Sequence, residues 1–235
     1  MNVAIVVAAG KGTRLGGNRP KQFLELDRIP VIIRTLRQFE RCREIDEIII
    51  VLPASQTEES ADWFRSAAKE FDLQKPMRTV GGGSTRAQSV QSGLAIISGA
   101  ELVAVHDGVR PFVTPDEIDR VVAAARTNGA AILVAPVADT IKEIKDGRIV
   151  GTLPRTLLRR ALTPQCFRFD ILKRAYEKLA EIEEEEGVEV TDDCLLVERL
   201  GVEIVAVEGS ARNIKITRAE DLVLGEAILK SVVSC

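Results

Sequence analysis

The sequence predicts an α/β fold with a mainly parallel sheet, and three observations predict it. Apolar runs of strand length alternate along the chain with segments of helical pattern. The runs are continuously apolar, as expected for parallel strands that are buried on both faces. One segment, Asp139–Arg155, instead alternates polar and apolar residues around the sequence KDGR. Asp-Gly between two alternating runs is typical of a β-hairpin.

Six runs are predicted as strands, and seven segments between or after them are predicted as helices. The expected strands are Val3–Val7, Ile48–Leu52, Met77–Val80, Leu102–His106, Ala131–Pro136 and Val202–Val207. The expected helices are Val31–Arg41, Thr57–Phe71, Arg86–Ser98, Pro115–Asn128, Phe169–Glu185, Thr191–Leu200 and Arg218–Val232. This alternation indicates a Rossmann-like sheet flanked by helices.

Two helix starts carry capping signals. The sequence TPDE at Thr114–Glu117 and the sequence TRAE at Thr217–Glu220 both have the spacing of a capping box. The first also places proline at the first helical position, where the missing N–H costs nothing. Thr191, Ser84 and Thr85 are further candidates for helix caps.

No repeat and no Pro/Ser-rich linker divides the chain, so we expect one domain over residues 1–235 with a β-arm inserted at about residues 139–155. Such an arm has two places to bury its apolar side chains. One is its own domain, and the other is a partner subunit.

Composition excludes several classes of protein. The chain has 235 residues, with 32 basic and 35 acidic side chains and a net charge of −3. A nucleic-acid-binding protein usually has a clear basic excess. No apolar run approaches the roughly 18 residues of a membrane span. The amino terminus lacks the basic region of a signal peptide, so we expect a cytoplasmic protein with reduced cysteines. Its single histidine, His106, excludes sites that need two.

The segment Ala8–Phe23, AAGKGTRLGGNRPKQF, is the first candidate for a binding site. It follows the first predicted strand, and ligands of α/β proteins bind beyond the carboxyl ends of strands. Glycines let backbone N–H groups approach a phosphate, and Arg14 and Lys21 add positive charge. The segment matches neither the dinucleotide pattern GxGxxG nor the P-loop pattern GxxxxGK[ST]. A flexible surface loop with solvated cations is the simpler alternative.

The residues resemble a known family. GxGxR followed by Pro-Lys is similar to the signature of nucleotidyltransferases, and further motifs follow in order. They are GGGSTRAQSV at Gly81–Val90, VHDGVRPF at Val105–Phe112, PVADTIK at Pro136–Lys142, ALTPQCF at Ala161–Phe167, TDD at Thr191–Asp193 and NIKITRAEDL at Asn213–Leu222. Together they resemble, over nearly the whole chain, the family of 2-C-methyl-D-erythritol 4-phosphate cytidylyltransferases of the non-mevalonate isoprenoid pathway.

The resemblance implies transfer of CMP from CTP to the polyol phosphate, by direct in-line attack of its phosphate on the α-phosphorus, with release of pyrophosphate. It implies catalytic cations, a Mg²⁺ ion or another divalent cation, and a homodimer in which the arm completes the partner's site. The implied catalytic residues are Arg14 and Lys21, and the implied metal ligand is Asp107. The implied CTP-binding residues are Ala8, Ala9, Gly10, Gly12, Gly82, Gly83, Ser89 and Lys215. The implied substrate-binding residues are Arg110, Thr140, Arg155, Thr163, Thr191 and Lys215.

Some of these residues have structural alternatives. Asp107 could cap a helix with Arg110 as its structural partner, and Lys21 could be a surface lysine. Adjacent residues of a strand point to opposite faces, so we expect His106 to be packed in the core and not to act as a base beside Asp107. Lys215 lies between Ile214 and Ile216. If this segment is a strand, the two isoleucines share one face and the lysine points to the cleft.

Two other functions remain open from sequence. Ribitol-5-phosphate cytidylyltransferases share most of these motifs, including HDGVRPF, and differ in the accepting alcohol. A nucleotide-binding regulatory protein without catalysis is a third possibility. It should lack one of the implied cations or the aspartate, whereas Arg14, Lys21, Asp107 and Lys215 are all present.

Overall fold

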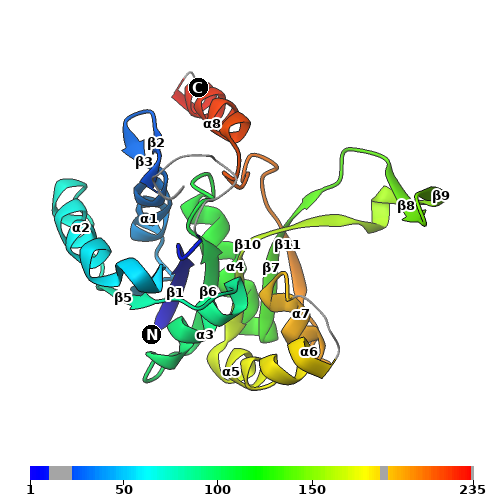
Figure 1. Ribbon diagram of the computed structural model, residues 1–235, viewed down its shortest axis with the longest axis horizontal. Coiled ribbons are helices and arrows are strands. Elements are labelled where there is room, and N and C mark those ends of the chain that lie inside the picture. Colours follow the sequence, from blue (N-terminus) through cyan, green and yellow to red (C-terminus); the bar gives the residue numbers. More distant parts are fainter. Residues whose placement is uncertain (11–22, 186–189, 234–235) are drawn as a thin grey trace.

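The computed structural model describes residues 1–10, 23–185 and 190–233 of the chain. Its centre is a seven-stranded sheet with the order β11-β7-β10-β6-β1-β4-β5, and helices cover both of its faces (Figure 1). Within this sheet, neighbouring strands are parallel except where β10 pairs with β6 and β7. The predicted α/β fold with a mainly parallel sheet is therefore confirmed.

The strands and helices have the following bounds. The strands are β1 (Asn2–Val7), β2 (Glu25–Leu26), β3 (Ile29–Pro30), β4 (Glu47–Leu52), β5 (Met77–Gly81), β6 (Leu102–Asp107), β7 (Ala130–Pro136), β8 (Ile141–Lys145), β9 (Arg148–Leu153), β10 (Arg159–Arg168) and β11 (Val205–Glu208). The α-helices are α1 (Val31–Arg41), α2 (Thr57–Glu70), α3 (Arg86–Ala95), α4 (Pro115–Asn128), α5 (Phe169–Glu177), α6 (Leu179–Glu185), α7 (Asp193–Glu198) and α8 (Ala219–Val233). Short 3₁₀ turns lie at η3 (Ala54–Gln56) and η4 (Arg155–Leu157). None of the helices in these ranges is both long enough and apolar enough to cross a membrane.

The core lies on both sides of the sheet because successive side chains of a strand face opposite ways. On β1, Ala4 and Val6 pack with α1, α2 and α4 on one face. Val3 and Ile5 pack with α3, α5, α6 and α7 on the other face. Strand β1 is thus buried on both faces, which explains its continuously apolar sequence.

Strand β1 is also where the connection changes direction. The chain continues from β1 to β4 and β5 on one side, and later places β6 on the other side of β1. Val7 and Asp107, the last residues of β1 and β6, are paired in register. Loops that leave such a point in opposite directions open a crevice beyond the strand ends, where α/β proteins bind ligands.

Strand β10 was not predicted, and it is the main difference from the expected fold. It runs antiparallel between β6 and β7, in the middle of the sheet. Its sequence contains Pro164, and a proline within a run argues against a central strand because it has no N–H to donate. The pairing with β7 shifts between Ala161 and Gln165, so the proline is accommodated at an irregularity.

Other differences concern helix ends. The helix predicted over Phe169–Glu185 is divided into α5 and α6 at Lys178. The capping box at Thr114 and Glu117 is confirmed. At the start of α8, however, Thr217 donates its N–H and hydroxyl to Asp221 instead of pairing with Glu220.

The predicted hairpin is present as β8 and β9 and projects away from the sheet (Figure 1). Asp146 and Gly147 at its turn both have positive φ, 50° and 73°. Positive φ at both central residues matches the twist of the two strands and is the reason for the Asp-Gly preference. Four apolar side chains of the arm are exposed, Ile144, Ile149, Val150 and Leu153, and so is Leu157 in η4 just after it.

Candidate functional site

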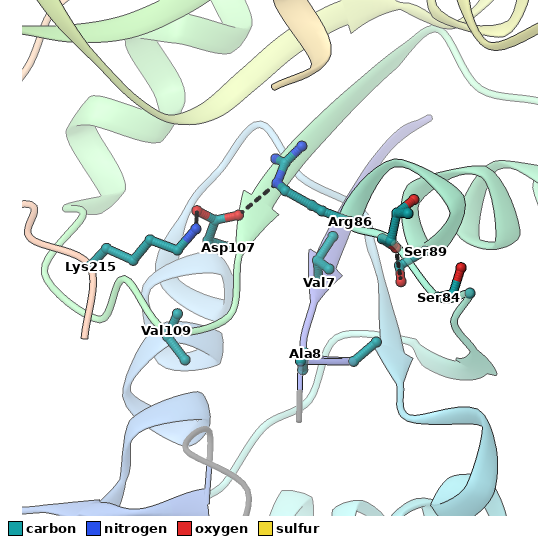
Figure 2. Close-up of a pocket in the computed structure, with 12 residues that line it drawn as sticks. Val7, Ala8, Ser84, Arg86, Ser89, Asp107, Val109 and Lys215 are labelled. Atoms are coloured by element: carbon teal, nitrogen blue, oxygen red, sulfur yellow. Dashed lines mark hydrogen bonds and ion pairs between the residues drawn. The ribbon is translucent and has the colours of Figure 1, made fainter. Parts of the chain in front are cut away.

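A cavity of about 330 Å³ lies beyond the carboxyl ends of β1 and β6. Three segments and one loop residue line it (Figure 2). The first segment is Val7–Gly10, at the end of β1 and just after it. The second is Gly83–Arg86 with Ser89, at the start of α3, and the third is Asp107 and Val109, at the end of β6 and just after it. Lys215 reaches in from the loop before α8. The cavity therefore lies at the switch point of the sheet, as the sequence predicts for a ligand site.

The turn between β5 and α3 needs glycine because it packs closely. A Cβ atom on Gly82 would lie 2.7 Å from both Ala9 Cβ and Ser89 Oγ, which is a collision. Gly82 is thus pressed against neighbouring residues, and its neighbour Gly83 lines the cavity. Thr85 caps α3 by accepting a hydrogen bond from the backbone N–H of Gln88 at 3.1 Å. The free N–H groups at such a helix start can bind an anion.

Asp107 is the centre of the charges in the cavity. Its Oδ1 accepts a hydrogen bond from Arg86 Nε at 3.0 Å. Its Oδ2 lies 2.9 Å from Lys215 Nζ and 3.3 Å from Arg110 Nε. Figure 2 shows the carboxylate between Lys215 and Arg86. Burial alone would raise the pKa of Asp107, but these three cations outweigh it and hold the pKa well below its usual range.

His106 belongs to the core beneath the cavity, as expected. It is fully buried, and burial lowers its pKa to about 3. The carbonyl of Arg110 lies 3.1 Å from Nε2, so Nε2 must carry the proton. Nδ1 then accepts from the hydroxyl of Thr163 at 2.9 Å. Neutral His106 therefore fixes the loop that follows β6, and it does not act as a base.

The predicted substrate-binding residues are not all brought to the cavity. Thr163 is buried beneath it, where its hydroxyl also accepts the N–H of Asp107 at 3.2 Å. Arg110 lies beside the cavity and donates to the carbonyl of Asn213 at 2.9 Å. Thr191 is exposed, and the cap of α7 is its neighbour Asp192.

Two further predicted substrate residues, Thr140 and Arg155, lie on the arm and are exposed. Arg155 donates to the carbonyl of Ala138 at 2.7 Å and so closes the base of the arm. Gly12, Arg14 and Lys21 lie outside the described residues.

Lys215 reaches the cavity as predicted, although its segment is a loop and not a strand. Ile216 is buried and Ile214 partly buried in a small cluster with Leu26 and Val31. The alternation of apolar and charged residues therefore predicted the side-chain directions, which here arise in a loop and do not require a strand.

Sequence reasoning missed Arg86 and Asp193. Arg86 is the first residue of α3 and lines the cavity. The positive end of the helix dipole disfavours a cation there, so an arginine at this position is itself a signal that carboxylates lie nearby. Asp193 was part of the motif TDD but received no role. It is completely buried, and its Oδ2 lies 2.9 Å from Arg86 Nη2.

The described residues of the cavity offer a magnesium ion one carboxylate, that of Asp107. Among them, no group of three or more potential ligand side chains is found. Proteins commonly bind Mg²⁺ through one or two carboxylates and the phosphates of the substrate. Asp107 can supply such a carboxylate, and its oxygens are now in contact with Arg86, Arg110 and Lys215. Its assignment as a metal ligand stays a prediction.

A parallel sheet with a switch-point cavity, a glycine-rich turn and converging cations defines a nucleotide-binding α/β protein. The family described as 2-C-methyl-D-erythritol 4-phosphate cytidylyltransferase matches residues 2–231. The chain belongs to this family.

Individual relatives agree over nearly full length. A 2-C-methyl-D-erythritol 4-phosphate cytidylyltransferase of Syntrophus aciditrophicus is 43% identical over 97% of this chain and 95% of its own. The protein of the same name from Bacillus velezensis is 42% identical over 97% and 96%. The crystal structure of a 4-diphosphocytidyl-2C-methyl-D-erythritol synthase from Anaerococcus prevotii superposes with a TM-score of 0.84, at 32% identity over 97% and 96%.

Proposed function

We propose that this protein transfers CMP from CTP to 2-C-methyl-D-erythritol 4-phosphate and releases pyrophosphate. The observation that carries this proposal is the family match over residues 2–231, which spans every segment that lines the cavity. The product is 4-diphosphocytidyl-2-C-methyl-D-erythritol. Ribitol 5-phosphate as the acceptor is not favoured, because the relatives described above are named for methylerythritol phosphate.

In the proposed reaction, an oxygen of the substrate phosphate attacks the α-phosphorus of CTP in line with the bond to the β-phosphate. That bond breaks, and its electron pair leaves on pyrophosphate. A phosphate monoester has a second pKa of about 6 and is largely dianionic at neutral pH. No residue has to remove a proton, which is consistent with a chain whose one histidine is buried and neutral.

The work of the protein is then to bind, orient and neutralise charge. The turn before α3 and the segment Ala8–Gly10 offer backbone groups to the nucleotide. Lys215 supplies a cation at the cavity, and Arg110 supplies one beside it. By family resemblance, Arg14 and Lys21 act on the charge that develops around the α-phosphorus.

A divalent cation, Mg²⁺, is part of the proposal and would neutralise phosphate charge when bound. We expect activity to disappear in excess chelator and to return when Mg²⁺ is added. The dissociation constant of CTP is also measured with and without Mg²⁺. This measurement shows whether the ion contributes to CTP affinity or to turnover. Full turnover in chelator would contradict this part of the proposal.

The test of the reaction is pyrophosphate release from CTP with each polyol phosphate in turn. We expect release with methylerythritol phosphate and a product whose mass is that of the cytidyl diphosphate. Faster release with ribitol 5-phosphate would show that the other acceptor is the substrate. Tight CTP binding without release for either would favour a regulatory protein.

We also propose that the protein is a cytoplasmic homodimer and that the arm of one subunit completes the site of the other. A two-stranded hairpin is only marginally stable alone, and the exposed apolar residues of this arm gain burial against a partner. Mixing Arg155→Ala chains with Lys21→Ala chains should restore some activity, because one of the two sites in the mixed dimer is intact. Verified heterodimers without activity would contradict an arm that acts in trans.

A further inference from the structure

Arg86 holds two carboxylates that come from different parts of the chain. Its Nε contacts Asp107 at the end of β6 at 3.0 Å, and its Nη2 contacts Asp193 at the start of α7 at 2.9 Å. Its side chain is 20% exposed, while Asp107 is 8% and Asp193 0% exposed. A planar guanidinium can join two carboxylates in a fixed geometry, which a lysine ammonium cannot do.

The far end of this arrangement is anchored in the core. Asp193 accepts a hydrogen bond from the hydroxyl of Tyr176 on α5, and its backbone N–H donates to Gln165 on β10 at 2.9 Å. Tyr176 is 3% exposed. Burial and the charge of Asp193 raise the pKa of Tyr176, so the phenol keeps its proton and remains a donor. Asp193 is thereby fixed from both sides.

The near end of the arrangement is held more loosely. Lys215 belongs to a loop, and its side chain is 37% exposed. Lys215 and Arg110 both contact Oδ2 of Asp107, whereas Arg86 contacts Oδ1. Asp107 can therefore exchange its Oδ2 partners when a nucleotide enters, and it keeps its orientation through Oδ1.

We infer that Arg86 is a positioning residue. It orients Asp107, and through Asp107 it directs Lys215 toward the nucleotide, while Asp193 and Tyr176 hold Arg86 in place. Two observations support a role in the site over one in the helix. A cation at the first residue of α3 opposes the helix dipole. The two partners of Arg86 are the carboxylate that lines the cavity and a buried carboxylate at the start of α7.

The inference rests on the transfer reaction proposed above, and its test is a double-mutant cycle between Arg86→Lys and Tyr176→Phe. Arg86→Lys keeps the charge and loses the bridge, so we expect kcat/KM for CTP to fall about 100-fold. Tyr176→Phe removes one hydroxyl far from the nucleotide, and we expect a fall of about 10-fold. In the Arg86→Lys chain, Tyr176→Phe should lower kcat/KM for CTP by a further factor of less than about 2, because the tyrosine acts by holding Arg86 in place.

The matched control is Arg126→Lys. Arg126 on α4 also joins two carboxylates, with Glu44 at 2.6 Å and Glu101 at 3.2 Å, but it lies outside the cavity lining. Its kinetics should equal those of the wild type. Thermal unfolding and near-ultraviolet circular dichroism of each variant separate a loss of packing from a loss of positioning.

Two results would overturn the inference: wild-type kinetics of Arg86→Lys, or equal effects of Tyr176→Phe in both backgrounds. The same cycle is also measured on the dissociation constant of CTP by calorimetry, without the second substrate. If the wild type binds CTP but does not transfer CMP, the proposed reaction fails, and the cycle on CTP affinity still decides the role of Arg86. A wild type that does not bind CTP would overturn both.

Discussion

The cavity and the arm differ in how their side chains are held. In the cavity, Asp107 contacts three cations and is 8% exposed, and one of these cations, Arg86, is also held by the buried Asp193. On the arm, Ile144 is 65% and Ile149 66% exposed, and within the described residues the two strands pair only with each other. The described residues that line the cavity thus have their polar partners within one chain. The arm presents apolar surface that nothing in the described chain covers.

Because of this difference, we expect substitutions in the two regions to affect different properties of the protein. Substitutions around the cavity should affect turnover and nucleotide affinity while the chain stays associated. Substitutions on the arm should weaken association of the subunits, and they should lower activity only because fewer subunits are associated. Three predictions test this division.

The largest effect is expected from Lys21→Ala. Its cation is proposed to act on charge that develops in the transition state, so kcat should fall about 1000-fold while the dissociation constant of CTP changes little. Single-turnover kinetics and calorimetry measure the two quantities. Lys69→Ala on α2, an exposed lysine outside the cavity, is the control and should behave as the wild type. An unchanged kcat in Lys21→Ala would remove this residue from the mechanism.

A smaller effect is expected from Ile149→Glu on the arm. A charge in a covered apolar contact should weaken association about 30-fold, because the carboxylate would lose its water. Sedimentation velocity over a range of concentrations measures the change. Val223→Glu on α8 is the matched control, because Val223 is 71% exposed and lies outside the arm. Equal association of both variants would mean that the arm is not the interface.

Per pH unit, the smallest effect is expected from His106. Its pKa of about 3 in the folded chain is lower than its unperturbed value of about 6.5. The unfolded chain therefore binds the proton first. The stability that His106 contributes is complete above pH 6.5, and it is lost as the pH falls from there toward 3, by about 1.4 kcal/mol per pH unit.

Denaturant unfolding at several pH values, with His106→Gln for comparison, measures this slope. The substitution should flatten the dependence between pH 6 and pH 4, because the chain has no other histidine. Identical slopes in both chains would show that His106 is not buried in its neutral form.

The sequence was informative wherever a local signal matched the structure. Helices α1 and α4 have the predicted bounds, and Asp-Gly in the arm predicted both the hairpin and its positive φ values. The cavity was placed correctly because strand ends of a parallel sheet meet at one edge. Ala8, Gly83, Ser89, Asp107 and Lys215 were all named in advance, and all line it.

The remaining features depend on contacts between distant segments, which a single sequence does not reveal. The segment of β10 received no prediction, and its Pro164 is accommodated in the middle of the sheet by the pairing shift between Ala161 and Gln165. Arg86 and Asp193 are separated by 107 positions along the chain. Thr163 has the polarity of a ligand contact, but its hydroxyl is used by His106 and by the backbone of Asp107.

The pairing of β7 with β10 has a consequence for protein engineering. Pro136 and Arg159 are register partners on adjacent antiparallel strands, so the chain enters and leaves the arm at neighbouring points. Excision of residues 137–158, with a tight Asn-Gly turn as the replacement, would join these strands as an ordinary hairpin. The shortened chain would retain every described residue that lines the cavity. If the arm forms the proposed interface, this chain would be a monomer in which nucleotide binding can be studied apart from assembly.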